Sequence, residues 1–136
     1  MINLANKKIL NVILVVFTIL DLTYSVICFA FPEFWFSGLH SAAYVDPQGL
    51  LRRTGAVWAA FAIFHFIAIF KWQKHAYWLA IIAGMRFSEL FADWTYLYFA
   101  ESVSFVGRIG LLITPPVNFL VCLYLLKSYL QISQKR

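Results

Sequence analysis

Four long apolar stretches follow one another along this chain of 136 residues. A helix needs about 20 mostly apolar residues to cross the roughly 30 Å hydrocarbon core of a bilayer. The stretches do not alternate polar and apolar residues as barrel strands do, so they are predicted to be helices. We therefore expect an all-α integral membrane protein, a four-transmembrane-helix bundle with spans at about 9–31, 50–70, 76–99 and 106–130.

The composition favours the same class of protein. Hydrophobic residues make up 62% of the chain and charged residues only 12%, whereas soluble domains are about half apolar and a quarter charged. Disorder is excluded because the chain is far too apolar. Two cysteines, Cys28 and Cys122, both lie in apolar runs and do not form a disulfide framework. The length fits one unit, so residues 1–136 are predicted to be a single transmembrane domain.

Charges in the loops predict the orientation of the spans. Seven cations fall on the side that holds both termini, and three fall on the other side. By the positive-inside rule, both termini are expected in the cytoplasm. The protein itself is expected in the cell membrane, specifically a bacterial inner membrane. No basic stripe or recognition motif accompanies the net charge of +5, so no nucleic-acid partner is expected. The seven are Lys7, Lys8, Lys71, Lys74, Lys127, Lys135 and Arg136; the three are Arg52, Arg53 and Arg108.

The segment between the first and second spans, residues 32–49, is rich in bulky residues such as Phe34, Trp35 and Tyr44. Aromatic side chains favour the headgroup layer, so a short outer interfacial helix or turn is predicted here. The pair Asp46–Pro47 resembles a helix start, with Asp46 as the N-cap and Pro47 at the first helical position.

Charged residues inside the third span are the most informative polar feature. Arg86, Glu89 and Asp93 are spaced i, i+3 and i+7, which places them within a helical sector of roughly 60°. Arg86 and Glu89 are predicted to pair along the helix. Ionisable residues inside a membrane usually face other helices or a wet cavity. We therefore expect this face of the helix to point into the bundle.

Depth along the spans proposes partners for these residues. Asp21 lies at the depth of Arg86, and Asn118 lies at a similar depth. Asp93 is nearer the outer surface, within reach of Arg53 or Arg108. We predict a buried polar cluster of Asp21, Arg86, Glu89 and Asn118, flanked by His65 and Asp93. Together with Tyr24, one turn from Asp21, these residues are the candidate ligand or ion site.

Two interpretations of this cluster remain open. In the first, the groups neutralise one another and fix which helices pair, although interhelical polar contacts contribute only about 0.6 kcal/mol on average. In the second, a carboxylate carries a proton or an ion, or the cluster binds a polar ligand. Asp21, Glu89 and Asp93 outnumber Arg86 in the interior, so at least one acid would be protonated or bound to a cation from elsewhere.

The sequence Thr114-Pro115-Pro116 is predicted to break the fourth span. Two adjacent prolines remove two backbone donors from the helix ladder. The break would either form a ligand or ion site beside Asn118 or be a simple kink. Gly107 and Gly110 precede it and offer small surfaces for close helix approach.

Motifs for catalysis and cofactors are not found. The chain has no catalytic triad, no phosphate-binding loop and no pair of Cys or His residues at helical metal spacing. No cofactor or metal is therefore predicted. Haem, quinone or pigment binding stays as a weaker alternative that would use His65, Trp58 and Trp94.

In length and number of spans the chain resembles small four-helix bacterial membrane proteins such as the DoxX-like group. The leading functional hypothesis is a non-enzymatic membrane subunit that packs in a homo-oligomer or a larger membrane complex. Its partners would be the lipid bilayer and other membrane chains or copies of itself. The alternative is a proton- or cation-coupled small-solute carrier or channel, with Asp21, Arg86 and Glu89 as the coupling site and Pro115–Pro116 as the gate.

Overall fold

The computed structural model describes residues 4–46 and 48–134 and is built entirely from α-helices over this part of the chain, with no strand. This confirms the all-α class. The helices are α1 (Leu4–Ala30), α2 (Pro32–His40), α3 (Leu50–Lys71), α4 (Tyr77–Phe99) and α5 (Phe105–Ser133). The short helix α2 occupies the segment where an interfacial helix or turn was predicted.

Three helices are long and apolar enough to cross a membrane: α1 from Asn6 onward, α3 and α5. Helix α4 has 23 residues but is not among them. Its length is sufficient, but its central part carries Arg86, Glu89 and Asp93. Length and composition thus support three of the four predicted crossings.

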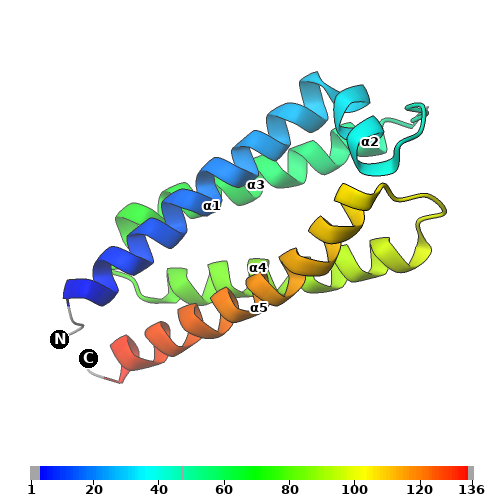
Figure 1. Ribbon diagram of the computed structural model, residues 1–136. Coiled ribbons are helices and arrows are strands. Elements are labelled where there is room, and N and C mark those ends of the chain that lie inside the picture. Colours follow the sequence, from blue (N-terminus) through cyan, green and yellow to red (C-terminus); the bar gives the residue numbers. More distant parts are fainter. Residues whose placement is uncertain (1–3, 47, 135–136) are drawn as a thin grey trace.

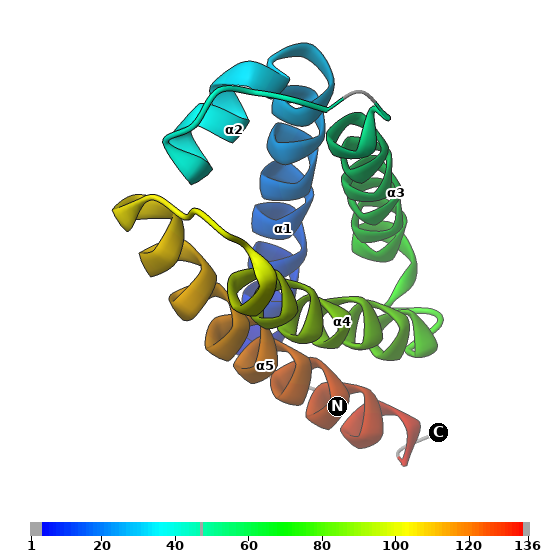
Figure 2. The ribbon, with the colours of Figure 1, turned by 90° about the vertical axis from the view of Figure 1, so that its right-hand side faces the viewer.

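The four long helices form two closely packed pairs, α1 with α3 and α4 with α5 (Figure 1). Both termini and the turn at residues 72–76 lie at one end of the molecule, which we call the terminal end. Helix α2 and the connection at residues 100–104 lie at the opposite end, which we call the α2 end. The pairs approach each other at the terminal end and stand further apart at the α2 end, where α2 fills part of the gap (Figure 2).

The apolar core lies toward the terminal end and joins the two pairs. All four long helices contribute to it, together with Trp72, which follows α3 directly. The indole Nε1 of Trp72 donates a hydrogen bond of 2.8 Å to Asn11 Oδ1, which links α1 to the end of α3. A buried indole needs such a partner because an unpaired N–H is costly in an apolar interior. The cluster consists of Leu10, Leu14, Ala68, Trp72, Leu79, Ile82, Ala83, Cys122 and Leu125.

Two glycines mark the closest contacts between helices. A Cβ on Gly55 of α3 would lie 2.9 Å from Phe29 and 3.1 Å from Cys28 of α1, so only glycine allows this approach. A Cβ on Gly107 of α5 would lie 2.5 Å from the Leu39 carbonyl oxygen of α2. Gly110, which was predicted to act in the same way, has no atom within 4 Å of the position its Cβ would take.

The predicted start of α3 at Asp46 and Pro47 is wrong in register. The helix begins at Leu50, after Gly49 in the left-handed conformation (φ 66°), and Pro47 lies outside the described residues. Asp46 nevertheless caps the helix from a distance, because its carboxylate accepts hydrogen bonds from the Leu50 and Leu51 amides at 2.8 and 2.9 Å. Asp46 therefore caps α3 from a position further back along the chain, rather than from the residue that directly precedes the helix.

The predicted break at Thr114-Pro115-Pro116 does not occur. Helix α5 continues from Phe105 to Ser133 with both prolines inside it, and its course bends in this region in both views (Figures 1 and 2). Proline removes backbone donors, but its fixed φ of about −65° is compatible with a helix. The alternative interpretation, a kink, describes α5 better than a broken helix does.

Candidate functional site

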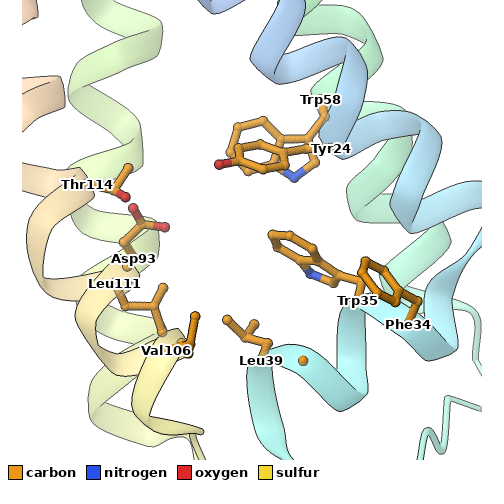
Figure 3. A pocket seen from close by; sticks show the side chains of 12 residues that line it. Tyr24, Phe34, Trp35, Leu39, Trp58, Asp93, Val106, Leu111 and Thr114 are labelled. Atoms are coloured by element: carbon orange, nitrogen blue, oxygen red, sulfur yellow. The ribbon is translucent and has the colours of Figure 1, made fainter.

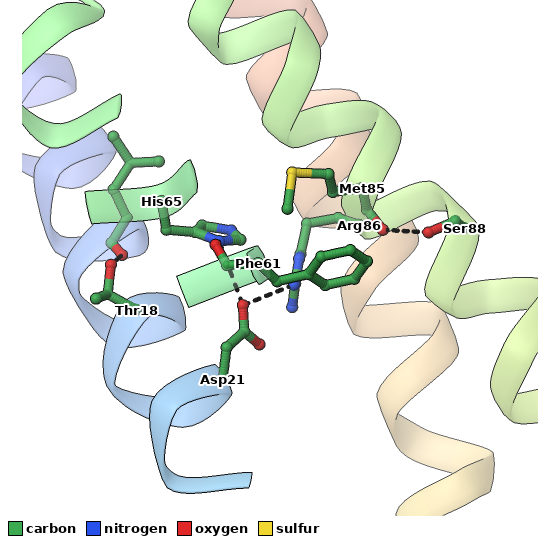
Figure 4. Close-up of polar contacts among 8 residues, drawn as sticks. Thr18, Asp21, Phe61, His65, Met85, Arg86 and Ser88 are labelled. Atoms are coloured by element: carbon green, nitrogen blue, oxygen red, sulfur yellow. Dashed lines mark hydrogen bonds and ion pairs between the residues drawn. The ribbon is translucent and has the colours of Figure 1, made fainter. Parts of the chain in front are cut away.

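A buried ion pair joins the two helix pairs near the middle of the molecule. Arg86 of α4 donates through Nη2 to Asp21 Oδ2 of α1 at 2.9 Å (Figure 4). The residues are only 2% and 1% exposed. The pairing predicted from depth is therefore present, and it crosses the interface between the pairs.

His65 of α3 completes a three-residue polar centre rather than flanking it. Its Nδ1 lies 2.7 Å from the Phe61 carbonyl oxygen and 3.2 Å from Asp21 Oδ2. Both neighbours are acceptors, so Nδ1 carries the proton and donates to the carbonyl. The carboxylate of Asp21 thus lies between an arginine and an imidazole N–H.

Aromatic rings surround this centre. The Arg86 guanidinium lies 4.6 Å from the ring centroid of Phe17 and 5.5 Å from that of Phe61. Phe17 also stacks on His65 with a centroid distance of 5.9 Å. Cation–π contacts stabilise a buried guanidinium, and the apolar rings exclude water from the ion pair.

Several polar atoms near this centre have no hydrogen-bond partner among the described residues: Asp21 Oδ1, His65 Nε2, Arg86 Nε and Asn118 Oδ1. Glu89 is 7% exposed, and neither a hydrogen bond nor an ion pair joins it to Arg86 within the described chain. The predicted pairing along the helix is therefore wrong, because Arg86 reaches across to Asp21 instead. Asn118 is buried but does not bond to the centre.

A cavity of about 350 Å³ opens at the α2 end, in the gap between the pairs (Figure 3). Every helix contributes to its lining: Tyr24 comes from α1, Trp35 from α2, Trp58 from α3 and Asp93 from α4, and Thr114 comes from α5. Glycines at 38, 107 and 110 widen it, since they present no side chain. The lining is otherwise apolar.

The cavity has an aromatic wall and an acidic wall. The Tyr24 ring lies 5.3 Å from Trp35 and 5.3 Å from Trp58, measured between centroids. Asp93 and Thr114 lie together on the opposite side (Figure 3). The expected pairing of Asp93 with Arg53 or Arg108 is not present, and both arginines are exposed. Both arginines lie in the first turns of their helices, α3 and α5, and neither lines the cavity.

Polar contacts hold α2 against α4 and against the connection at residues 100–104, next to the cavity. His40 Nδ1 contacts the Ser102 carbonyl oxygen, and its Nε2 contacts the Tyr96 hydroxyl. The carbonyl can only accept, so Nδ1 donates to it and Nε2 accepts from Tyr96. The Ser104 amide donates to the Leu39 carbonyl at 2.7 Å, and its hydroxyl donates to the Gly38 carbonyl at 2.7 Å.

The predicted polar residues do not gather in one cluster, and Glu89 and Asn118 join neither the buried centre nor the cavity lining. Asp21, His65 and Arg86 meet in the buried centre, while Tyr24, Asp93 and Thr114 line the cavity. Pro115 and Asn118 are buried in α5, and Pro116 is exposed.

Sequence reasoning missed Trp35, Leu39 and the His40 contact, all on α2. The concentration of bulky residues in this segment was the available signal, but it was interpreted as membrane anchoring.

The residues suggested for a cofactor are not assembled. Trp58 lines the cavity, His65 does not, and Trp94 is 47% exposed. Within residues 4–46 and 48–134, no group of three His, Cys, Asp or Glu side chains could hold a metal ion.

Comparisons with protein families, curated proteins and solved structures find no match to the chain. The resemblance to the DoxX-like group stays one of length and number of apolar stretches. A functional assignment therefore rests on the geometry of the cavity and of the buried centre.

Proposed function

We propose that this chain is an integral membrane protein that binds a small amphiphilic molecule in the cavity at the α2 end. The observation that carries the proposal is the cavity itself, which all five helices line and which presents one carboxylate in an apolar, aromatic surface. Ligand sites are typically concave, about 300–1,000 Å³ in volume, and mostly apolar with a few placed polar groups. Binding without catalysis is proposed, because Tyr24 and Asp93 are the titratable side chains of the described lining.

The two ends of the molecule support a division of roles. The terminal end is closely packed around Trp72 and contains the apolar core. The buried Asp21–Arg86 pair then ties the helix pairs together between that core and the cavity. On this proposal, the core and the Asp21–Arg86 ion pair hold the two helix pairs together, and the ligand binds at the α2 end.

We further propose that α4 crosses the membrane as a fourth span. Its 23 residues would extend about 35 Å, enough for the hydrocarbon core. Arg86 and Glu89 are buried against the other helices, so the lipid would meet mainly apolar side chains. The loop charges favour a cytoplasmic terminal end in a bacterial inner membrane.

The binding proposal is tested with purified full-length protein in lipid nanodiscs. Three probes share a phenyl ring and a short chain: 2-phenylethylammonium, 2-phenylethanol and phenylacetate. Saturable binding is measured from the change in the protein's tryptophan fluorescence and by calorimetry, with empty nanodiscs subtracted. We expect at least one probe to bind.

Two glycine variants show whether the binding occurs in the cavity. Gly110 and Gly84 both have open space where a Cβ would lie, but only Gly110 lines the cavity. Gly110→Leu should abolish the binding, and Gly84→Leu should keep it. Failure of all three probes to bind, or equal binding by both variants, would contradict the proposed function.

A second candidate is the membrane subunit, in a homo-oligomer or a larger complex. It is favoured by the small share of each candidate span that the chain itself covers: 22% of the most apolar stretch is buried. Lipid or neighbouring chains must cover the rest. Purification in mild detergent followed by mass measurement tests it; a single chain of 15.7 kDa without companions would count against it.

A further inference from the structure

We infer that the ligand of this cavity is an organic ammonium cation that carries an apolar group. The inference rests on the proposed function and specifies its substrate class. Its basis is that one cavity holds both a carboxylate without an ion-pair partner among the described residues and a wall of three aromatic rings.

The first argument is the balance of charge. Asp21 and Glu89 are buried acids, Asp93 is partly buried, and Arg86 is the buried cation among the described residues. Arg86 is already engaged, since it bonds to Asp21 and lies against Phe17 and Phe61. Asp93 has no hydrogen bond or ion pair with any described residue. A cation in the cavity would therefore supply the charge that the chain itself does not.

The second argument is the aromatic wall. Tyr24 lies within 5.3 Å of both Trp35 and Trp58, centroid to centroid, so three electron-rich rings gather on one side. Ring faces attract cations, and tryptophan does so most strongly. Figure 3 shows these rings across the cavity from Asp93 and Thr114. An ammonium group between the two walls would meet a carboxylate on one side and rings on the other.

The lining also argues against other ligand classes. Among the described residues, no lysine, arginine or histidine lines the cavity, so an anion would meet Asp93 without a balancing charge. A sugar or other polyol would find few hydrogen-bonding partners, because the side chains at Leu39, Val106 and Leu111 are apolar. A bare metal ion would have one carboxylate, where the hard cations take six or more oxygen ligands. An apolar group on the ammonium fits the remaining surface.

The experiment compares probes that differ mainly in the terminal group. At pH 7, 2-phenylethylamine is protonated, as lysine amines are; 2-phenylethanol is its neutral counterpart and phenylacetate its anionic one. With the wild-type chain in nanodiscs, we expect the ammonium to bind at least about tenfold more tightly than the alcohol, as a charge-assisted hydrogen bond implies. The anion should bind more weakly than either.

The matched variants are Asp93→Asn and Glu101→Gln. Each removes one negative charge, but Glu101 is exposed in the connection after α4 and does not line the cavity. Asp93→Asn should reduce ammonium affinity to that of the alcohol and leave alcohol affinity unchanged. Glu101→Gln should preserve the preference for the cation. Circular dichroism checks that both variants stay helical.

The wild-type probe comparison needs no substitution, so it decides the question even if Asp93→Asn fails to fold. Equal or tighter binding of the alcohol or the acid at the Gly110-sensitive site would overturn the cation inference and leave ligand binding in place. An ammonium preference that survives Asp93→Asn would overturn the assigned role of that carboxylate. Absence of binding by all probes would overturn the proposed function and the inference together.

Discussion

Arg86 and Asp21 show how a single residue pair can join the two helix pairs of this protein. Each charge alone would be very unfavourable in a buried apolar setting, and each is made acceptable by the other. The pair crosses from α4 to α1, so its loss would act on the interface between the helix pairs. The unpartnered Asp21 Oδ1 and Arg86 Nε indicate that the pairing satisfies only part of the hydrogen-bonding capacity of these groups.

A double-mutant cycle measures this pair. Arg86→Met should lower the free energy of unfolding by about 3–5 kcal/mol, because it leaves the Asp21 carboxylate buried without its cation. The combined Asp21→Leu and Arg86→Met protein should recover most of that loss, because no charge is then left unpaired. Thermal unfolding in detergent provides the readout. Additive losses in the double variant would show that the two residues act independently.

Asp46, in the connection before α3, makes the stability of the folded protein depend on pH. The Leu51 and Leu50 amides donate to its carboxylate, so the pKa of Asp46 is lowered from its ordinary value of 3.8. The folded protein therefore favours the charged form, and the stabilisation is present above the unfolded pKa and is lost as pH falls through the lowered folded pKa.

Comparison with Asp46→Ala isolates this effect from the other acids. At pH 7 the wild-type protein should have the higher Tm. The difference should shrink below about pH 4 and disappear once Asp46 is protonated in both states. Melting curves between pH 2.5 and 7 would check it, and a Tm difference that stays constant over that range would contradict the capping role.

At the scale of the helices, Gly107 determines how closely α2 can approach α5. A methyl group there would lie 2.5 Å from the Leu39 carbonyl oxygen, a backbone atom that cannot rotate away. The same contact is reinforced by Ser104, whose amide bonds to that carbonyl. The position of α2 over the cavity thus depends on a residue without a side chain.

Gly107→Ala should destabilise the protein by about 1–3 kcal/mol, the usual range for overpacking. Gly84→Ala is the control: its Cβ would meet nothing within 4 Å, so it should stabilise helix α4 by about 0.5–1 kcal/mol. Tm values and protease sensitivity of the segment around α2 provide the measurements. Two variants with the same stability would show that the α2–α5 contact has no energetic role.

Helix positions were largely predictable, because long apolar runs specify both the helical state and its approximate ends. The exceptions have local causes. Gly49 in a left-handed conformation delays α3, and this depends on backbone geometry that Asp46–Pro47 alone does not reveal. The two prolines of α5 were predicted to break the helix, but helical hydrogen bonds on either side keep it continuous.

At the scale of the whole molecule, the candidate site was predictable only in part. Depth along the spans matched Arg86 with Asp21, and the ion pair between them is present. Asp93 was predicted nearer the outer surface, but the cavity that it lines was not foreseeable, since the cavity depends on how far apart the helix pairs stand at the α2 end. The cavity requires that separation together with α2, and neither is encoded in the pattern of any one helix.

The proposed four crossings predict a specific labelling pattern. Ser41, His75 and Glu101 are exposed in three successive connections, so a cysteine at each reports one side of the membrane. With a membrane-impermeant maleimide in intact spheroplasts, Ser41→Cys and Glu101→Cys should react, and His75→Cys should react only after disruption. Labelling of positions 75 and 101 from the same side would exclude a membrane crossing by α4.

The contact at Gly55 has a mechanical consequence. Since α1 packs closely against α3, and α5 packs along α4, we expect each helix pair to move as a rigid unit. The two helix pairs are joined at the terminal end by Trp72 and the apolar core, and the cavity lies between them at the α2 end. On the proposed binding function, a small rotation of one helix pair against the other at the core would change the width of the cavity, so core residues that do not line the cavity would affect ligand affinity.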